Sequence, residues 1–181
     1  MIHGLNVNLR AVERSDARLL ADLLNQSSVQ TGWGTGAVPV SVHRIEQDIE
    51  QWLEIERTTQ RPACLIIETL EHEPIGALVI VESSRVGQGT AALSIAIHPE
   101  RQAHGYGRDA LAATIEALFD DWNIHRIELT CEAGNDLAAR MYEALGFVRE
   151  ATRREATYMN GAYHDQHLYG LLSTDPRPNA T

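Results

Sequence analysis

The chain has 181 residues, of which 44% are hydrophobic and 22% are charged, and its formal net charge is −10. This length suits one domain with a sizeable core and is too short for two ordinary domains. The acidic balance argues against nucleic acid as a partner and favours cationic small molecules or basic proteins, while the apolar runs fall short of the roughly 20 residues that span a membrane.

The two ends of the chain carry few structural signals. Met1 to Arg10 alternates polar and apolar residues without the apolar core of a signal peptide, so we expect a cytoplasmic protein with no membrane partner. Residues 173–181 contain two prolines and no apolar pattern, which predicts a flexible tail after a domain of residues 1–172. Cys64 and Cys131 lie in apolar runs and are expected to be buried thiols.

In chain order, the first half alternates between strand and helix patterns. Ser15 and Ser41 each precede a helical pattern and are expected to cap it. A glycine-rich segment between the two helices contains Trp33, which either covers a pocket or fills part of the core. The expected elements are a strand over residues 5–9, a helix over 16–25, a loop over 26–40, a helix over 42–56 and hairpin strands over 63–70 and 75–81.

The second half is expected to form a strand, a helix and a strand, followed by a further helix and a final hairpin. Asn135 is expected to cap the last helix, and Gly146 suits the left-handed residue that ends it. Asn160-Gly161 is a strong hairpin signal. The expected elements are a strand over residues 90–97, a helix to about 122, a parallel strand over 126–131, a helix over 136–145 and strands over 147–158 and 162–171.

The turn before the helix that ends near Trp122 carries the first functional pattern. It reads Gln102-Ala103-His104-Gly105-Tyr106-Gly107-Arg108. Its small residues let backbone N–H groups surround an anion at a helix N-terminus, and Arg101 and Arg108 could add contacts to phosphate oxygens. The turn lacks the G-x-x-x-x-G-K-[ST] pattern of nucleotide-binding loops. It predicts a phosphate site of another type.

This turn resembles the Q/R-x-x-G-x-G/A signature of the GNAT N-acetyltransferases, and residues 135–147 resemble that family's N-x-x-A-x-x-x-Y-x-x-x-G-F pattern. The expected order βααβββαβαββ is also that of the family, so the resemblance covers about residues 5–171. It implies a single α/β (α+β) domain with a mixed central sheet flanked by helices. It also implies an acyltransferase that uses acetyl-CoA as cosubstrate.

The resemblance assigns parts of the coenzyme to parts of the chain. The amides of the turn would hold the pyrophosphate, Asn135 would bind the pantetheine arm, and Ala138 would leave room for it. The strand before the turn would pair with pantetheine, and the amide of Ile97 would polarise the thioester carbonyl. The expected coenzyme-binding residues are Ile95, Ala96, Ile97, Gln102, Ala103, His104, Gly105, Tyr106, Gly107, Arg108, Asn135 and Ala138.

Tyr142 is the expected catalytic residue. A positioned phenol can protonate the thiolate that leaves when an amine attacks a thioester. Tyr142 lies two helical turns after Asn135, so both side chains can address one extended ligand. The alternative is a core tyrosine whose hydroxyl bonds to the backbone. No residue is assigned as the general base, because the strand before the turn has no carboxylate. His98, Glu82, Glu128 or a water relay could serve.

The acceptor is expected to be a primary amine of a small molecule, a polyamine or an amino acid. The closing pattern of residues 147–171 resembles the branch that holds ribosomal-protein N-terminal, spermidine and amino-acid acetyltransferases. Trp33, Tyr158 and Tyr163 would border the acceptor pocket, with Trp33 on a lid. The alternatives are N-terminal acetylation of a basic protein and, from another class, a non-catalytic acyl-CoA sensor. A homodimer and the length of the acyl group are left open.

No metal site is expected. His164 and His167 lie three positions apart on a predicted strand, where their side chains face opposite sides. Glu71-His72-Glu73 falls in a predicted turn and lacks a second ligand pair at the spacing of a zinc motif. The Glu71–Glu73 cluster is therefore interpreted as solvated side chains, and His164 and His167 are not expected to bind a metal.

Overall fold

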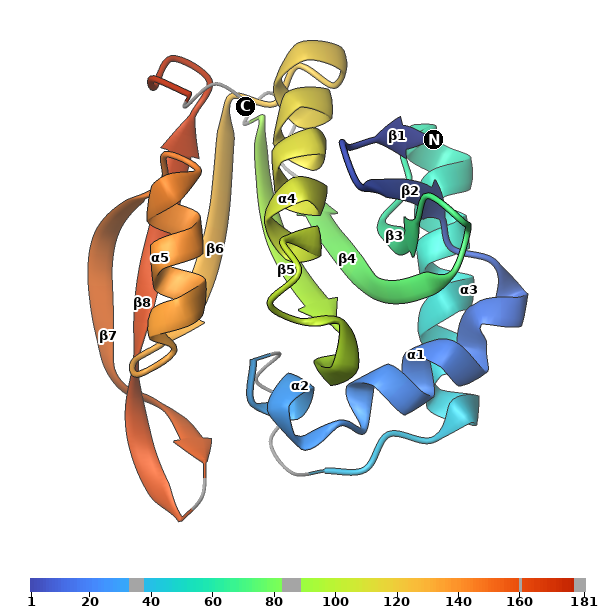
Figure 1. The fold of residues 1–181 in the computed structure, drawn as a ribbon, viewed down its shortest axis with the longest axis horizontal. Coiled ribbons are helices and arrows are strands. Elements are labelled where there is room, and N and C mark those ends of the chain that lie inside the picture. Colours follow the sequence, from blue (N-terminus) through green and yellow to red (C-terminus); the bar gives the residue numbers. More distant parts are fainter. Residues whose placement is uncertain (33–37, 83–88, 160, 178–181) are drawn as a thin grey trace. The chain divides into compact units, whose positions relative to one another are not determined.

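The computed structural model describes residues 1–32, 38–82, 89–159 and 161–177 (Figure 1). The chain forms two compact units, Met1–Ile80 with Ile95–Ala113 and Val81–Ser94 with Thr114–Thr181. The hydrogen-bonded strands follow the order β1-β2-β3-β4-β5-β6-β8-β7. Because β5 and β6 are parallel and the other described pairs are antiparallel, the sheet is mixed. The α/β class predicted from the sequence is confirmed.

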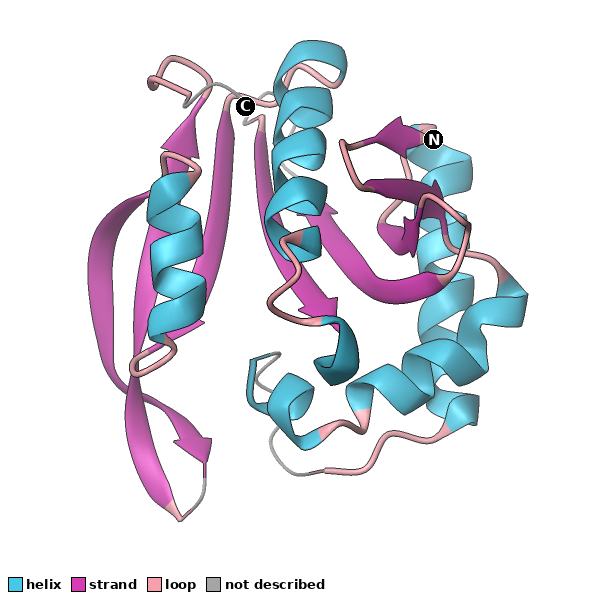
Figure 2. Ribbon diagram, in the orientation of Figure 1, coloured by secondary structure: helices cyan, strands magenta, loops and turns pink. Residues whose placement is uncertain are grey.

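The first unit combines antiparallel strands with helices that precede and follow them (Figure 2). A 3₁₀ turn precedes α1, and another precedes α4. The elements that lie wholly or partly in this unit are β1 (Ile2–His3), β2 (Val7–Ala11), α1 (Ala17–Leu24), α2 (Ser27–Gly32), α3 (Val42–Thr59), β3 (Cys64–Thr69), β4 (Pro74–Glu82), β5 (Thr90–Ile97) and α4 (Tyr106–Glu116).

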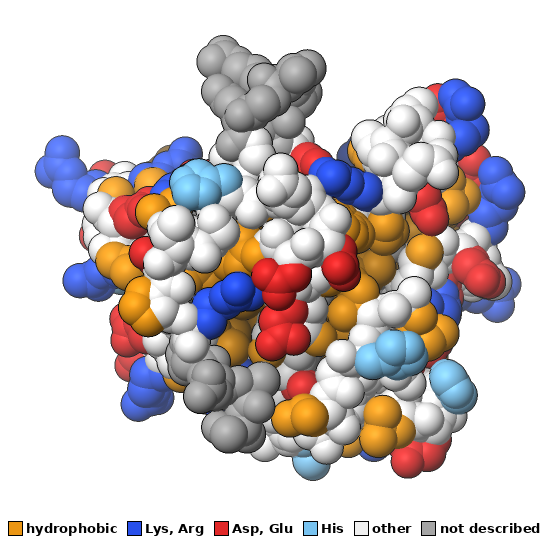
Figure 3. All heavy atoms as spheres, turned by 90° about the horizontal axis from the view of Figure 1, so that it is seen from above, with side chains coloured by type: hydrophobic (Ala, Val, Ile, Leu, Met, Phe, Trp, Pro, Cys, Tyr) orange, Lys and Arg blue, Asp and Glu red, His pale blue; other side chains and the backbone are white. Residues whose placement is uncertain are grey.

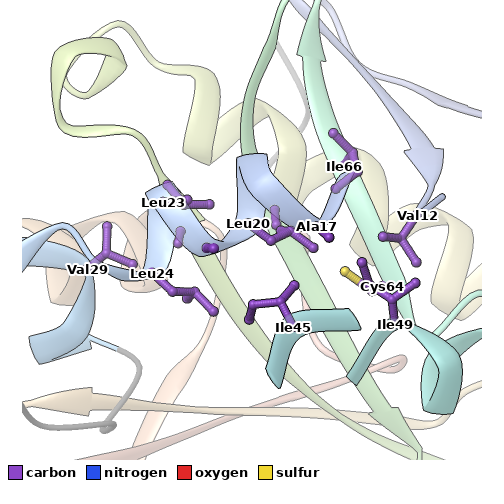
Figure 4. Close-up of a cluster of buried hydrophobic side chains, with 13 residues drawn as sticks. Val12, Ala17, Leu20, Leu23, Leu24, Val29, Ile45, Ile49, Cys64 and Ile66 are labelled. Carbon is purple, nitrogen blue, oxygen red and sulfur yellow. The ribbon is translucent and has the colours of Figure 1, made fainter. Parts of the chain in front are cut away.

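The core of this unit is built from one face of α1, two residues of α3 and the inward side chains of the strands (Figure 4). Spacings of three and four residues place the leucines of α1 on one face, which packs against Ile45 and Ile49. Burying each such side chain contributes about 1.5–3 kcal/mol. The buried cluster consists of Val12, Ala17, Leu20, Ala21, Leu23, Leu24, Val29, Ile45, Ile49, Cys64, Ile66, Ala77 and Ala96.

The second unit contains β6 (Arg126–Glu132), α5 (Asp136–Ala144), β7 (Val148–Met159) and β8 (Ala162–Leu172), with a π-helical turn over Ala117–Asp121. β8 lies between β6 and β7 and is antiparallel to both. β6 runs parallel to β5, as the sequence predicts for a strand–helix–strand unit. Helix α5 lies along β8 and β6 in Figure 1, and its Tyr142 contacts the ring of Tyr169.

Two of the three predicted helix caps are confirmed. The Ser41 hydroxyl accepts the amide of Arg44 at 3.1 Å, and the Asn135 side chain accepts the amide of Ala138 at 3.2 Å. Gly146 follows α5 with φ of 94°, which is the left-handed conformation expected there. Cys64 and Cys131 are buried and free, also as predicted.

Three expectations for the N-terminal region are wrong. Ser15 does not cap α1, because it lies within the 3₁₀ turn Arg14–Asp16, which Glu13 and Asp16 close with a reciprocal capping box. Part of the expected loop forms α2, which Val29 anchors in the core at 4% exposure. The first strand is β2, two residues later than predicted, and the short strand β1 precedes it. Trp33 and Asn160 lie outside the described residues.

Candidate functional site

The turn between β5 and α4 presents backbone donors to solvent. Ala103 and Gly105 take left-handed φ values of 62° and 83°, which turn the chain sharply before α4 begins. In the described part of the chain, the amides of Gly105, Tyr106 and Gly107 donate no hydrogen bond. A Cβ atom added at Gly105 would meet no atom within 4 Å. This open set of donors at a helix N-terminus fits a phosphate group.

Asp109 holds the start of α4 in place. Its carboxylate accepts the amides of Leu5, Asn6 and Val7 at 2.9, 2.6 and 3.1 Å, respectively, so it ties the first turn of α4 to the chain between β1 and β2. Gly4 allows this approach, because a Cβ there would lie 2.7 Å from the Asp109 carboxylate. The sequence gives no signal for this contact, since its partners lie more than 100 residues apart.

The end of β5 is fixed from two directions. The Gln102 side chain donates to the carbonyl of Ile97 at 2.9 Å, and the amide of His98 donates to Ile75 at 2.8 Å. Successive amides of a strand point to opposite edges, so the amide of Ile97 is directed away from β4. Gly76 of β4 makes this packing possible, because a Cβ there would lie 2.3 Å from the carbonyl oxygen of Ala96.

In the second unit, β6 has a free edge near its end. Each residue from Arg126 to Glu132 pairs with β8, whereas pairing with β5 is described only from Arg126 to Glu128. Residues 129–132 are therefore paired on one side only among the described strands. An extended ligand could bond to such an edge as an added strand does.

Tyr142 lies on α5 and is 8% exposed. Its ring packs edge-on against the rings of Phe147 and Tyr169, with ring centroids 6.1 and 5.9 Å apart, respectively. Its hydroxyl has no hydrogen-bond partner among the described residues. Burial raises the pKa of Tyr142 well above its usual value, with smaller contributions from Cys131 and Tyr169. The phenol therefore keeps its proton near neutral pH.

The neighbours of Tyr142 differ in what they could contribute. Asn135 is exposed, and its side-chain oxygen is taken by the N-cap bond, while its NH₂ group has no described partner. Cys131 directs its thiol to the carbonyl of Asn135 at 3.6 Å. Burial, followed by the charges of Glu132 and Asp136, raises the pKa of Cys131 to about 11, so it is not a thiolate nucleophile near neutral pH.

The predicted acceptor residues are partly brought together. Tyr158 and Tyr163 face each other across the final hairpin, with ring centroids 5.1 Å apart and exposures of 60% and 67%, whereas Trp33 lies outside the described residues. Among the candidate bases, Glu128 forms an ion pair with Arg126 at 2.6 Å, which favours a structural role.

Comparison with known proteins agrees with this arrangement. The sequence model of the acetyltransferase (GNAT) domain matches residues 6–148. Spermidine N(1)-acetyltransferase of Vibrio cholerae is 27% identical over 174 residues, which cover 92% of this chain and 94% of the relative. The corresponding enzyme of Escherichia coli K12 is 26% identical over 177 residues, covering 91% and 88% of the two chains.

Solved structures share the fold. The spermidine N-acetyltransferase of Vibrio cholerae in complex with CoA and spermine superposes with a TM-score of 0.83 at 26% identity, covering 93% of this chain and 96% of that chain. The ribosomal-protein-S5-alanine acetyltransferase of Vibrio fischeri gives 0.78 at 23% identity, covering 97% and 98%, respectively. The match over residues 6–148, together with the strand order and the turn before α4, establishes that the chain belongs to the GNAT acetyltransferase family.

Proposed function

We propose that this protein transfers an acetyl group from acetyl-CoA to a primary amine of a small polyamine-type molecule. The observation that carries the proposal is Tyr142, a buried and protonated phenol whose hydroxyl has no described partner. It lies on the helix that bears the family pattern. Two relatives named as spermidine N(1)-acetyltransferases match over nine-tenths of the chain, which supports this class of acceptor.

The residues present fit the coenzyme. The unpaired amides of Gly105, Tyr106 and Gly107 offer donors for a pyrophosphate, and the exposed Arg108 next to them can add a charge-assisted contact. The NH₂ group of Asn135 has no described partner and can donate to an amide carbonyl of the pantetheine arm. The half-buried Ala138 on the following turn adds little bulk.

When bound, acetyl-CoA supplies an acetyl thioester, which an amine can attack directly. Tyr142 donates its proton to the departing sulfur, which a phenol with a raised pKa can do because it is protonated before the reaction. The amide of Ile97, directed away from β4, donates to the carbonyl oxygen on which negative charge develops. The reacting amine must be neutral, so its proton leaves through water or a base that we do not assign.

The charge of the molecule favours a cationic acceptor. The formal net charge is −10, and Figure 3 shows acidic and basic side chains interspersed on one face of the molecule without a continuous basic area there. No helix among the described residues is long and apolar enough to cross a membrane. A homodimer and a cytoplasmic location stay predictions from the sequence.

A thiol-release assay tests the proposal. Purified protein with acetyl-CoA should release CoA in the presence of spermidine, and mass spectrometry should detect acetylated spermidine. The control is Gly105→Val, which is strained at φ of 83° and places a branched side chain among the turn amides. It should lose coenzyme binding in calorimetry while staying folded. Saturable acetyl-CoA binding by the wild type with no turnover on any amine would instead support the sensor.

A further inference from the structure

Glu132, the last residue of β6, carries a buried carboxylate that is only half satisfied. The residue is 6% exposed. Its Oε1 atom accepts the Thr157 hydroxyl at 3.1 Å and the Gln166 side-chain amide at 2.8 Å. Its Oε2 atom is buried and has no hydrogen-bond partner among the described residues. The sequence carries no signal for this site, because the side-chain partners of Glu132 lie on β7 and β8.

The partners of Glu132 do not neutralise its charge. Thr157 and Gln166 are neutral donors, and Arg153 donates to the Gln166 oxygen at 3.1 Å rather than to the carboxylate. Within the described ranges, Glu132 takes part in no ion pair. A buried charge without a counter-ion is costly, and Oε2 is the place where a cation would relieve that cost.

The register of β6 defines the face on which this carboxylate lies. Cys131 directs its thiol toward α5, as its 3.6 Å contact with the carbonyl of Asn135 shows. Successive side chains of a strand point to opposite faces, so Glu132 lies on the face away from α5, beside its register partner Gln166. It also ends the stretch of β6 whose other edge is unpaired.

We infer that Glu132 binds the second, non-reacting ammonium group of a diamine or polyamine acceptor through Oε2, an inference that rests on the proposed function. The reacting nitrogen must be neutral to attack, whereas a carboxylate in contact with an amine favours its charged form. Glu132 therefore suits the nitrogen that stays protonated. The same carboxylate repels an acceptor that carries its own carboxylate, so it selects polyamines over amino acids.

The test compares two acceptors with the same four-carbon chain, 1,4-diaminobutane and butylamine, of which only the first carries a second ammonium group. In the wild type, kcat/KM should be at least about tenfold higher for the diamine, because a desolvated charge pair contributes that much or more. Glu132→Gln removes the charge with little change in shape. It should bring the diamine-to-butylamine ratio close to one, mainly by raising the KM of the diamine, and should leave the KM of acetyl-CoA unchanged.

Two further variants separate selectivity from folding. Glu132→Asp keeps the charge and should retain part of the preference for the diamine. Glu150→Gln neutralises an exposed carboxylate on β7, in the same unit, and should leave the ratio unchanged. Thermal midpoints of all variants identify any loss caused by unfolding.

The outcomes are distinguishable. A wild type that uses butylamine as well as the diamine, or a Glu132→Gln variant with an unchanged ratio, overturns the inference and leaves the acetyltransferase proposal standing. Absence of turnover on every amine refutes the proposed function instead. In that case, calorimetry of spermidine binding in the presence of CoA decides the role of Glu132, since equal affinities for the wild type and Glu132→Gln would overturn it.

Discussion

Two buried acidic regions of the molecule are built in opposite ways. In the first unit, the Arg10 guanidinium donates two hydrogen bonds of 2.8 Å to the Asp16 carboxylate and one of 2.6 Å to the Glu68 carboxylate. In the second unit, Glu132 is as buried as those two carboxylates, each residue being 6% exposed, yet no cation among the described residues pairs with it.

The difference separates a structural ion cluster from a group available to a ligand. In the Arg10 cluster, the planar guanidinium uses both of its edges, so each carboxylate has a cationic partner and the cluster joins β2, β3 and the turn before α1. In the second unit, Glu132 Oε2 is buried and has no partner among the described residues. An unpaired buried polar atom weakens a fold, so it calls for an explanation such as a bound ion or ligand.

The largest expected effect comes from breaking the Arg10 cluster. Arg10→Met keeps most of the apolar stem but takes the guanidinium away from the buried Asp16 and Glu68, while the exposed His72 ring stays 3.4 Å from Glu68 Oε2. Removing one partner of a buried ion pair costs about 3–5 kcal/mol, and since the Arg10 side chain is 24% exposed we expect the lower end of that range. Urea unfolding of the wild type and the variant measures the difference.

The matched control is Arg14→Met. Arg14 pairs with Glu50 at 2.5 Å, but both side chains are more than half exposed, so the pair is screened by water. Its loss should leave the free energy of unfolding nearly unchanged. Equal effects of the two substitutions would mean that the Arg10 cluster is no more than a surface network.

The second prediction concerns Asp16, an acidic residue of the same cluster. Burial acts to raise the pKa of Asp16, but hydrogen bonds from Arg10 and from the amide of Glu13 outweigh it, and the net shift is downward. A carboxyl whose pKa is lowered by folding stabilises the native state above its unfolded pKa of about 3.9, and this contribution disappears as the pH falls toward the folded value.

Asp16→Asn should therefore be less stable than the wild type by about 2 kcal/mol between pH 5 and 7, a typical value for hydrogen bonds to charged groups. The gap should narrow below about pH 4, where the wild-type carboxyl takes up its proton. Urea titrations at a series of pH values measure the gap. A gap that stays constant down to pH 2 would show that the charge of Asp16 does not stabilise the fold.

The fold could be predicted where local patterns were strong. Ser41 and Asn135 stand before apolar repeats and cap the helices expected of them, and the hairpin signals gave the right strand pairs. The failures have local causes. β1 is two residues long, and α2 has a single buried apolar residue, Val29, which is too little for a periodic pattern.

The candidate site also has residues that the sequence predicts and residues that it does not. The turn of residues 102–108 and the helix of Tyr142 are contiguous in the sequence, so a pattern could reveal them. Asp109 and Glu132 act through partners that only the folded chain brings near. Asp109 binds amides more than 100 residues away, and the side-chain partners of Glu132 lie 25 and 34 residues along the chain. Neither side chain is distinctive in its own stretch of sequence.

The third prediction tests whether Tyr142 belongs with the unpaired groups. Tyr142→Phe keeps the ring contacts with Phe147 and Tyr169 and removes only the hydroxyl, which has no described partner. Stability and acetyl-CoA affinity should therefore be retained or slightly increased. A positioned acid contributes about 10² to 10⁴-fold, so kcat should fall at least about tenfold even if water partly replaces the phenol.

Both quantities should be measured on one preparation of the variant. A lowered thermal midpoint with normal kcat per folded molecule would place Tyr142 with the structural groups and remove it from the mechanism. The thermal midpoint matters here because a lost structural hydrogen bond costs about 1 kcal/mol, which is large enough to detect.

The smallest expected effect sharpens the comparison most, because it applies one substitution to two equally buried glutamates. Glu68→Gln removes a charge that pairs with Arg10, so it should lower the free energy of unfolding by about 1–2 kcal/mol. Glu132→Gln removes a charge that no described cation neutralises, and the new side chain can still accept from Thr157 and Gln166. The free energy of unfolding of Glu132→Gln should stay within about 0.5 kcal/mol of the wild type or rise, as is found when uncompensated buried charges are replaced.

Adding spermidine should then raise the thermal midpoint of the wild type and of Glu68→Gln more than that of Glu132→Gln, because a ligand stabilises a protein in proportion to its affinity for the native state. Equal destabilisation by both substitutions, with equal responses to spermidine, would mean that Glu132 has a structural counter-ion of its own in solution, and the contrast between the two regions would not hold.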